Sequence, residues 1–139
     1  MPSTFLIAFE PPILPAETVP VPESLEGLDW TEILAVHTQY YDVLYRIDGK
    51  LFCYYPADVV TVLSDLHFEW QCARKRQSHV VTLSGYTVLD IDFQGETARF
   101  YDPLERSLGS ERQSIGGEFS AESIEFGFRS ASAAVWNLM

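Results

Sequence analysis

Residues 40–56 read YYDVLYRIDGKLFCYYP, a stretch in which five tyrosines and a phenylalanine surround one Asp-Gly pair. Its Asp48-Gly49 pair suits a two-residue type I′ turn, because both central residues of that turn need positive φ. The residues on either side are rich in aromatic and β-branched side chains, which are typical of strands. The stretch therefore predicts a β-hairpin with its turn at Asp48-Gly49.

A regular hairpin about this turn sets the two faces of its strands, because side chains alternate along a strand. One face is almost entirely apolar and is assigned to the core: Tyr41, Val43, Tyr45, Ile47, Phe52 and Tyr54. The other face is mixed: Asp42, Leu44, Arg46, Leu51, Cys53 and Tyr55. Within this aromatic stretch, the pattern leaves Tyr55 as the candidate for contact with a partner.

A strand and a proline-rich connector are predicted before the hairpin. Residues 1–10 contain the first strand, TFLIAFE. Residues 11–28 form the connector, whose five prolines between positions 11 and 22 exclude helix and central strand. Asp29 and Glu32 then occupy the N-cap and capping-box positions of a short helix. The body of the domain spans residues 29–139.

The principal helix is predicted from Pro56 to about Arg74. Four apolar residues lie at i, i+4, i+7 and i+11, which is the spacing of one helical face: Val59, Leu63, Leu66 and Trp70. The bases at positions 74–76 fall at the C-terminal end of this helix, where positive charge complements the helix dipole.

A second hairpin is predicted around Gln94-Gly95. One face is apolar: Leu89, Ile91, Phe93, Ala98 and Phe100. The other face is polar and solvated, with Asp90 placed opposite Arg99: Tyr86, Val88, Asp90, Asp92, Thr97, Arg99 and Tyr101. Residues 103–117 read as a polar loop, and residues 118–129 read as a further strand because apolar residues alternate there.

Together these elements predict an α+β fold in a single domain, residues 1–139. The sheet is expected to be mainly antiparallel, with about five or six strands built from hairpins and one principal helix packed on a face. A chain of 139 residues, 47% of them hydrophobic, is long enough to bury its own core.

Charge is the strongest global signal. Twenty acids against nine bases give a net charge of −11, and no Lys or Arg precedes Arg46. This field repels nucleic acid and anionic membranes, and it accelerates encounter with a basic protein. Apolar runs are too short for a membrane helix, and Cys53 and Cys72 are expected to be reduced thiols. We therefore expect a cytoplasmic protein with a basic protein partner, no nucleic acid and no membrane contact.

No complete catalytic, metal or cofactor motif stands out. His37, His67 and His79 lack the spacing of zinc ligands, and the glycines match no phosphate-binding loop. No nucleophile elbow is present. The sequence therefore favours a binding role over an enzyme, with no metal and no cofactor, and it does not indicate an oligomeric state.

The candidate contact surface lies on the second hairpin. Asp90 and Asp92 leave the same face of a strand about 7 Å apart, near the carboxylate separation of inverting glycosidases. This separation would suit a catalytic carboxylate pair. The alternative interpretations are the ordinary solvated face of a strand and a protein-binding patch. The predicted partner-binding residues are Asp90, Asp92, Tyr86, Tyr101 and Arg99. A second acidic surface is formed by Glu23, Glu26, Asp29 and Glu32.

Three functional hypotheses follow. The leading one is a non-enzymatic, acidic protein-binding domain of the immunity type, which neutralises a basic, nuclease-like bacterial toxin. The second is a small ligand-binding or enzymatic domain with a pocket between sheet and helix, whose polar groups are Asp90, Asp92, Arg99 and His67. The third is a small acidic secretion or assembly chaperone, which would be a dimer with an exposed apolar groove.

Overall fold

The computed structural model describes residues 3–14, 20–83 and 86–139, without the side chains of Leu83, Tyr86, Arg106 and Ser110. Within these residues the chain has an α+β fold with two antiparallel sheets and three α-helices. The first sheet has the order β1-β2-β3: β1 (Phe5–Glu10), β2 (Tyr40–Ile47) and β3 (Lys50–Asp58). The second has the order β4-β5-β6-β7: β4 (His79–Leu83), β5 (Tyr86–Gln94), β6 (Thr97–Tyr101) and β7 (Ser114–Ser120). The helical segments are α1 (Trp30–Val36), α2 (Val59–Arg74), α3 (Ala121–Trp136) and the 3₁₀ segment η1 (Pro103–Glu111).

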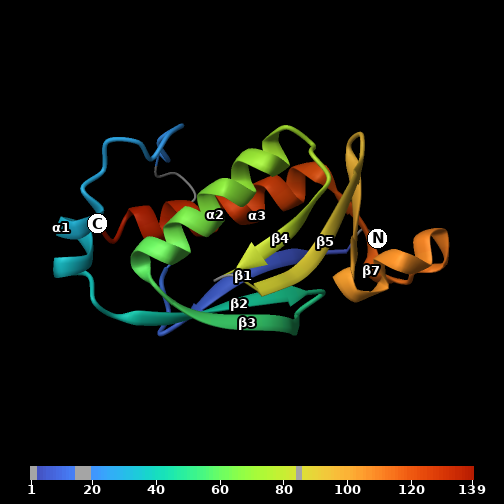
Figure 1. Ribbon diagram of the computed structural model, residues 1–139, viewed down its shortest axis with the longest axis horizontal. Helices are drawn as coiled ribbons and strands as arrows, with labels where there is room; N and C mark the ends of the chain where they lie inside the picture. The colour runs from blue at the N-terminus through green and yellow to red at the C-terminus, as the bar shows by residue number, and fades with distance from the viewer. Residues whose placement is uncertain (1–2, 15–19, 84–85) are drawn as a thin grey trace.

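Helices α2 and α3 pack against each other and lie on one side of the sheets (Figure 1). Ser3 connects the sheets, because its backbone N–H donates to Glu118 O at 3.0 Å and its Oγ accepts from the Gly117 N–H at 2.7 Å. The hydrophobic core lies between the helices and the two sheets. Within this core the centroid of the Phe5 ring lies 5.8, 5.3 and 5.2 Å from those of Tyr45, Phe100 and Phe128.

The predicted fold class, α+β with antiparallel strands, is confirmed, but its finer details match only roughly. The described residues form seven strands in two sheets where five or six strands were expected. They also form a second long helix, because residues 118–129 are not a strand: β7 ends at Ser120 and α3 begins at Ala121. Strand β4 was not predicted either.

The N-cap of α3 and the spacing of its buried residues explain why residues 121–129 form a helix and not the predicted strand. Ser120 caps the helix by accepting a hydrogen bond from the Ser123 N–H at 3.2 Å. The alternation that suggested a strand is not the pattern that is buried, since Phe126 is 49% exposed. The buried residues follow helical spacing, at i, i+4, i+7 and i+11: Ile124, Phe128, Ala131 and Val135.

The first hairpin has the predicted turn, with φ of 52° at Asp48 and 80° at Gly49. Its register is different beyond the turn, because a β-bulge pairs Tyr45 with Cys53 and leaves Phe52 as the extra residue. The two neighbouring tyrosines of β3 therefore exchange faces. Tyr55 is buried at 5% exposure and Tyr54 is 62% exposed, which reverses the predicted assignment.

The predictions for α1, for α2 and for the connector are confirmed with shifts of a few residues. Asp29 caps α1, and α2 begins at Val59 after the cap residue Asp58. The predicted stripe on α2 is buried: Val59, Leu63, Leu66 and Trp70. The described parts of the connector, residues 11–14 and 20–28, contain no strand or helix, and Ile13 and Val21 pack against the core.

Candidate functional site

The second hairpin places the predicted contact residues one position away from the expected register. Its turn lies at Gly95-Glu96, so Asp92 is paired with Arg99 and Asp90 with Tyr101. The expected Asp90–Arg99 pair is therefore wrong, and Arg99 instead forms an ion pair with Glu118 at 3.5 Å. The Tyr86 side chain lies outside the described residues. The apolar face is buried as predicted: Leu89, Ile91, Phe93, Ala98 and Phe100.

Asp90 is not part of a solvated strand face. It is buried, at 6% exposure, and its Oδ2 accepts a hydrogen bond from Arg112 Nη1 at 2.9 Å. The guanidinium of Arg112 stacks on the ring of Tyr101, 3.8 Å from its centroid. The segment between β6 and β7 therefore places Arg112 over β5, where it forms an ion pair with Asp90, one of the predicted acidic contact residues.

An open polar cleft of about 320 Å³ lies beside this ion pair. Its lining residues come from β4 and the residue before it, from β5 and from the segment before β7: Ser78, His79, Asp90, Ile91, Asp92, Gly109 and Arg112. Asp92 accepts hydrogen bonds from Ser78 Oγ at 3.2 Å and from Gln94 Nε2 at 3.1 Å. Both carboxylates of the Asp90-x-Asp92 pair are thus already engaged by side chains of the protein.

His79 of the same cleft pairs with Glu69, a residue of α2 that sequence reasoning missed. His79 Nε2 bonds to Glu69 Oε2, and His79 Nδ1 lies 2.8 Å from Gln77 O. No ring nitrogen remains for a substrate, so the imidazole is held in a structural role. The missed signal was helical spacing, since Glu69 is buried in a second stripe of α2: Val62, Leu66, Glu69 and Ala73.

Burial is the largest influence on the pKa of both partners. It raises the pKa of Glu69, and the hydrogen bond and charge of His79 oppose this only in part. Burial by itself would lower the pKa of His79, but the hydrogen bond and charge of Glu69 outweigh it, so the His79 pKa is raised. The two shifts have the same sense: the folded pair keeps its shared proton to a higher pH than the separated groups.

The second predicted surface, Glu23, Glu26, Asp29 and Glu32, begins at Glu23, where the connector is hydrogen-bonded to α2. His67 Nε2 lies 2.8 Å from Pro22 O, and Gln71 Nε2 donates to Glu23 O at 3.1 Å. Arg74 forms an ion pair with Glu23, in which Arg74 Nη1 donates a hydrogen bond to Glu23 Oε2. This hydrogen bond lowers the pKa of the Glu23 carboxyl. His67 therefore holds the connector against α2. The second hypothesis had instead placed this residue among the polar groups of a pocket.

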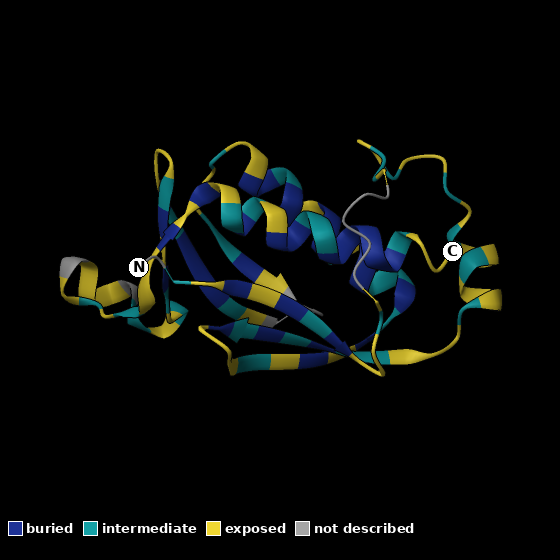
Figure 2. Ribbon diagram, turned by 180° about the vertical axis from the view of Figure 1, so that it is seen from behind, coloured by how far each residue is buried: buried dark blue, intermediate teal, exposed yellow. Residues whose placement is uncertain are grey.

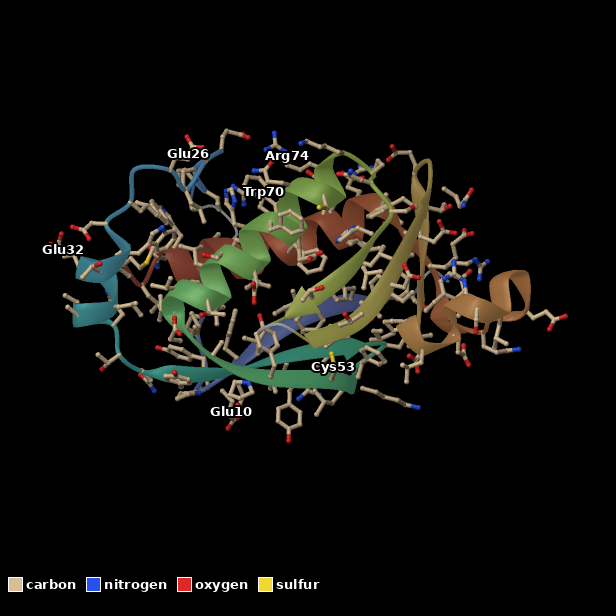
Figure 3. The ribbon with its side chains drawn as sticks, in the orientation of Figure 1. Glu10, Glu26, Glu32, Cys53, Trp70 and Arg74 are labelled. Atoms are coloured by element: carbon tan, nitrogen blue, oxygen red, sulfur yellow. The ribbon has the colours of Figure 1, made fainter. Side chains whose placement is uncertain are left out.

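Beyond this anchor, α1 and the residues just before it have exposed side chains, which we call the α1 surface: Glu26, Asp29, Glu32, Leu34 and Val36. No side chain of α1 is buried (Figure 2), and Leu34 and Val36 are 42% and 70% exposed. Asp29 caps the helix by accepting from the Glu32 N–H at 3.1 Å. In Figure 3, Glu32 projects outward from α1, and Glu26 projects from the connector segment before it.

The two cysteines are free thiols, as expected. Cys53 lies on β3, and burial raises the pKa of its thiol to about 11, which keeps it protonated at neutral pH. Cys72 is buried on α2, and burial raises its pKa as well. Among the described residues, no group of three or more His, Cys, Asp or Glu side chains is arranged to hold a metal ion.

Comparison with protein-family models, with curated protein sequences and with solved structures finds no match for this chain. Within the described ranges, no helix is long and apolar enough to cross a membrane. A functional proposal therefore rests on the chain's own side chains and on the surfaces that they form.

Proposed function

We propose that this chain is a non-enzymatic, acidic protein-binding domain that recognises a basic protein through the α1 surface. The observation that carries the proposal is the combination of exposed apolar and acidic side chains on α1 and on the residues just before it. Leu34, Val36 and Glu32 are exposed on α1, Glu26 is exposed in the segment before it, and no Lys or Arg occurs before Arg46. Apolar contact area with a charged rim is the usual anatomy of a protein interface.

The α1 surface is favoured over the second hairpin because its acids are more available. Asp90 is buried against Arg112, and Asp92 accepts from Ser78 and Gln94. Glu26 and Glu32 are exposed and form none of the ion pairs in the described part of the chain. They can therefore attract a positively charged partner without first breaking an internal contact.

Within this class, we propose an immunity-type inhibitor that neutralises a basic, nuclease-like bacterial toxin in the cytoplasm. A nuclease must attract phosphate and so presents a basic surface. A domain with a net charge of −11 complements such a surface and competes with nucleic acid for it. The two free thiols are consistent with a reducing compartment.

The polar cleft beside His79 supports a weaker second candidate, the small ligand-binding or enzymatic domain. Its volume of about 320 Å³ is adequate for a small molecule. However, both nitrogens of His79 and both aspartates already have partners within the protein. A ligand would have to displace these contacts, so the cleft carries less weight than the α1 surface.

The test combines capture from the source cells with direct binding of purified components. The bait is compared with the variant E26K/E32K, which leaves the Asp29 cap intact, and with E111K/E122K, which has the same net charge but alters other exposed acids. We expect a basic protein that binds the wild type and the control alike. Its association rate with E26K/E32K should be at least tenfold slower, and raising the salt concentration should slow its binding to the wild type.

Two outcomes would overturn parts of the proposal. Equal association rates for the two variants would remove the α1 surface as the contact site. If the purified partner is basic but its nuclease activity is unaffected by binding, the immunity-type role is wrong while the binding role stands. A partner with an acidic surface would contradict the proposal as a whole.

A further inference from the structure

In the described part of the chain, no helix covers the face of the first sheet that points away from α2 and α3 (Figures 1 and 3). Its side chains are those that alternate with the buried residues of β1, β2 and β3, and they form three rows across the strands. We call it the outer face. Leu6, Tyr54 and Leu51 on this face are 58%, 62% and 48% exposed.

Charge is distributed unevenly along the outer face. At one end, Glu10 of β1 lies directly opposite Asp42 of β2. Like charges in directly opposed positions repel each other and destabilise a sheet. At the other end, Arg46 lies between Leu6 and Leu51, its cross-strand neighbours. None of the ion pairs in the described part of the chain involves these three charged residues.

The middle row of the outer face is uncharged. It consists of Ala8, Leu44 and Tyr54, which are aligned across the three strands. Along the strand direction, the outer face therefore has an acidic row, an apolar row and a row that contains the base Arg46. Arg46 and Asp42 are four residues apart on β2, about 13 Å along the strand, with Leu44 midway between them.

We propose that the outer face is the interface of a homodimer in which two copies pack sheet against sheet. The two-fold axis lies in the interface, along the row of Ala8, Leu44 and Tyr54. Rotation about this axis places Arg46 of each copy over Asp42 and Glu10 of the partner subunit. Stacked sheets lie about 10 Å apart, a distance that an arginine and a carboxylate side chain together can span.

A second copy is the occupant that this pattern specifies. A two-fold interface requires a surface that is complementary to itself, so a base on one side of the axis must find an acid at the same distance on the other. The outer face meets this condition through Arg46 and Asp42. The dimer also relieves the Glu10–Asp42 repulsion twice, since each acidic pair receives one arginine, and it buries the exposed rings of both copies of Tyr54.

The test is the oligomeric state of the purified chain, measured by sedimentation velocity over a range of concentrations. We expect a dimer for the wild type. R46D places an acid over Asp42 and Glu10, and D42R places a base over Arg46, so each should weaken dimerisation at least tenfold. The double variant D42R/R46D restores opposite charges across the axis and should recover much of the affinity.

The variant R99D is the matched control, because it reverses an exposed arginine in the second sheet. It should remain a dimer, and circular dichroism should show all variants folded, since the changed side chains lie on the surface. A wild type that stays monomeric overturns the proposal, as does a D42R/R46D variant no more dimeric than either single variant. These outcomes are independent of the α1 surface, whose variants leave the outer face unchanged.

Discussion

Gly127 of α3 lies against the ring of Phe5 in β1, so closely that a Cβ at position 127 would come within 2.8 Å of Phe5 Cδ2. Phe5 in turn contacts the fully buried rings of Tyr45, Phe100 and Phe128. The missing side chain of Gly127 therefore sets how near the helix pair can approach the first sheet, and it explains a glycine in the interior of a helix.

We predict that Gly127→Ala destabilises the protein by about 1 kcal/mol. Alanine improves helix propensity by about 1 kcal/mol, but overpacking a core typically costs about 1–3 kcal/mol, and the Phe5 ring already contacts the rings of Tyr45, Phe100 and Phe128. Urea unfolding monitored by circular dichroism measures the change. Phe5→Leu should make room for the new methyl group, so the double variant should lose less than the two single losses combined. A gain in stability for Gly127→Ala would mean that the contact is loose.

Local patterns predicted the parts of the fold that depend on neighbouring residues. The Asp48-Gly49 turn, the Asp29 cap and the buried stripe of α2 were predicted because each is encoded within a few positions. Residues 118–129 were assigned wrongly because Ile124, Phe126 and Phe128 fit a period of two over a short window. The helical period becomes clear only when Ala131 and Val135 are included.

The candidate site was less predictable because its contacts are distant in sequence. Arg112 reaches Asp90 from 22 residues away, after η1 has turned the chain back toward the sheet. The bulge after Leu51 also changed which tyrosine faces outward, and no residue type in β3 marks it. A one-residue slip is enough to move every following side chain to the other face.

The bulge in β3 predicts that two adjacent tyrosines differ strongly in their contribution to stability. In the R46D background, which removes the proposed dimer contact, Tyr55→Ala should cost about 3 kcal/mol because it leaves a cavity in the core. Tyr54→Ala should change the free energy of unfolding by less than about 0.5 kcal/mol, since that side chain is exposed. Urea unfolding of both variants gives the comparison. Similar losses at the two positions would indicate the regular hairpin register.

The start of α2 depends on Asp58, whose Oδ1 accepts from the Thr61 N–H at 2.9 Å and whose Oδ2 accepts from Thr61 Oγ1 at 3.1 Å. We predict that Asp58→Ala costs about 1–2 kcal/mol, because the helix loses its N-cap. Asp58→Asn retains a side-chain oxygen acceptor and should recover most of this loss. Thermal unfolding of the two variants separates the cap from other effects. Equal losses for both would show that the negative charge matters more than the hydrogen bond.

The buried Glu69–His79 pair predicts a pH-dependent stability. The pKa of His79 is raised from its ordinary value of 6.5, so the folded state binds this proton more tightly than the unfolded chain. Its contribution is fully present below about pH 6.5 and is lost as the pH rises through the raised pKa. The shift of Glu69 acts in the same direction, since its pKa is also raised. The free energy of unfolding should therefore fall between neutral and alkaline pH.

His79→Gln tests this origin, because glutamine cannot carry the charge. The variant should lose about 3 kcal/mol at pH 6, where it leaves Glu69 buried without its cation, and its stability should fall less steeply above pH 6.5 than that of the wild type. His37→Gln, which removes a histidine near the end of α1, should retain the wild-type pH dependence. The double variant E69Q/H79Q should be more stable than His79→Gln, since no buried charge remains. If urea unfolding shows the same pH slope for His79→Gln and the wild type, the pair does not hold the proton, and another group must account for the slope.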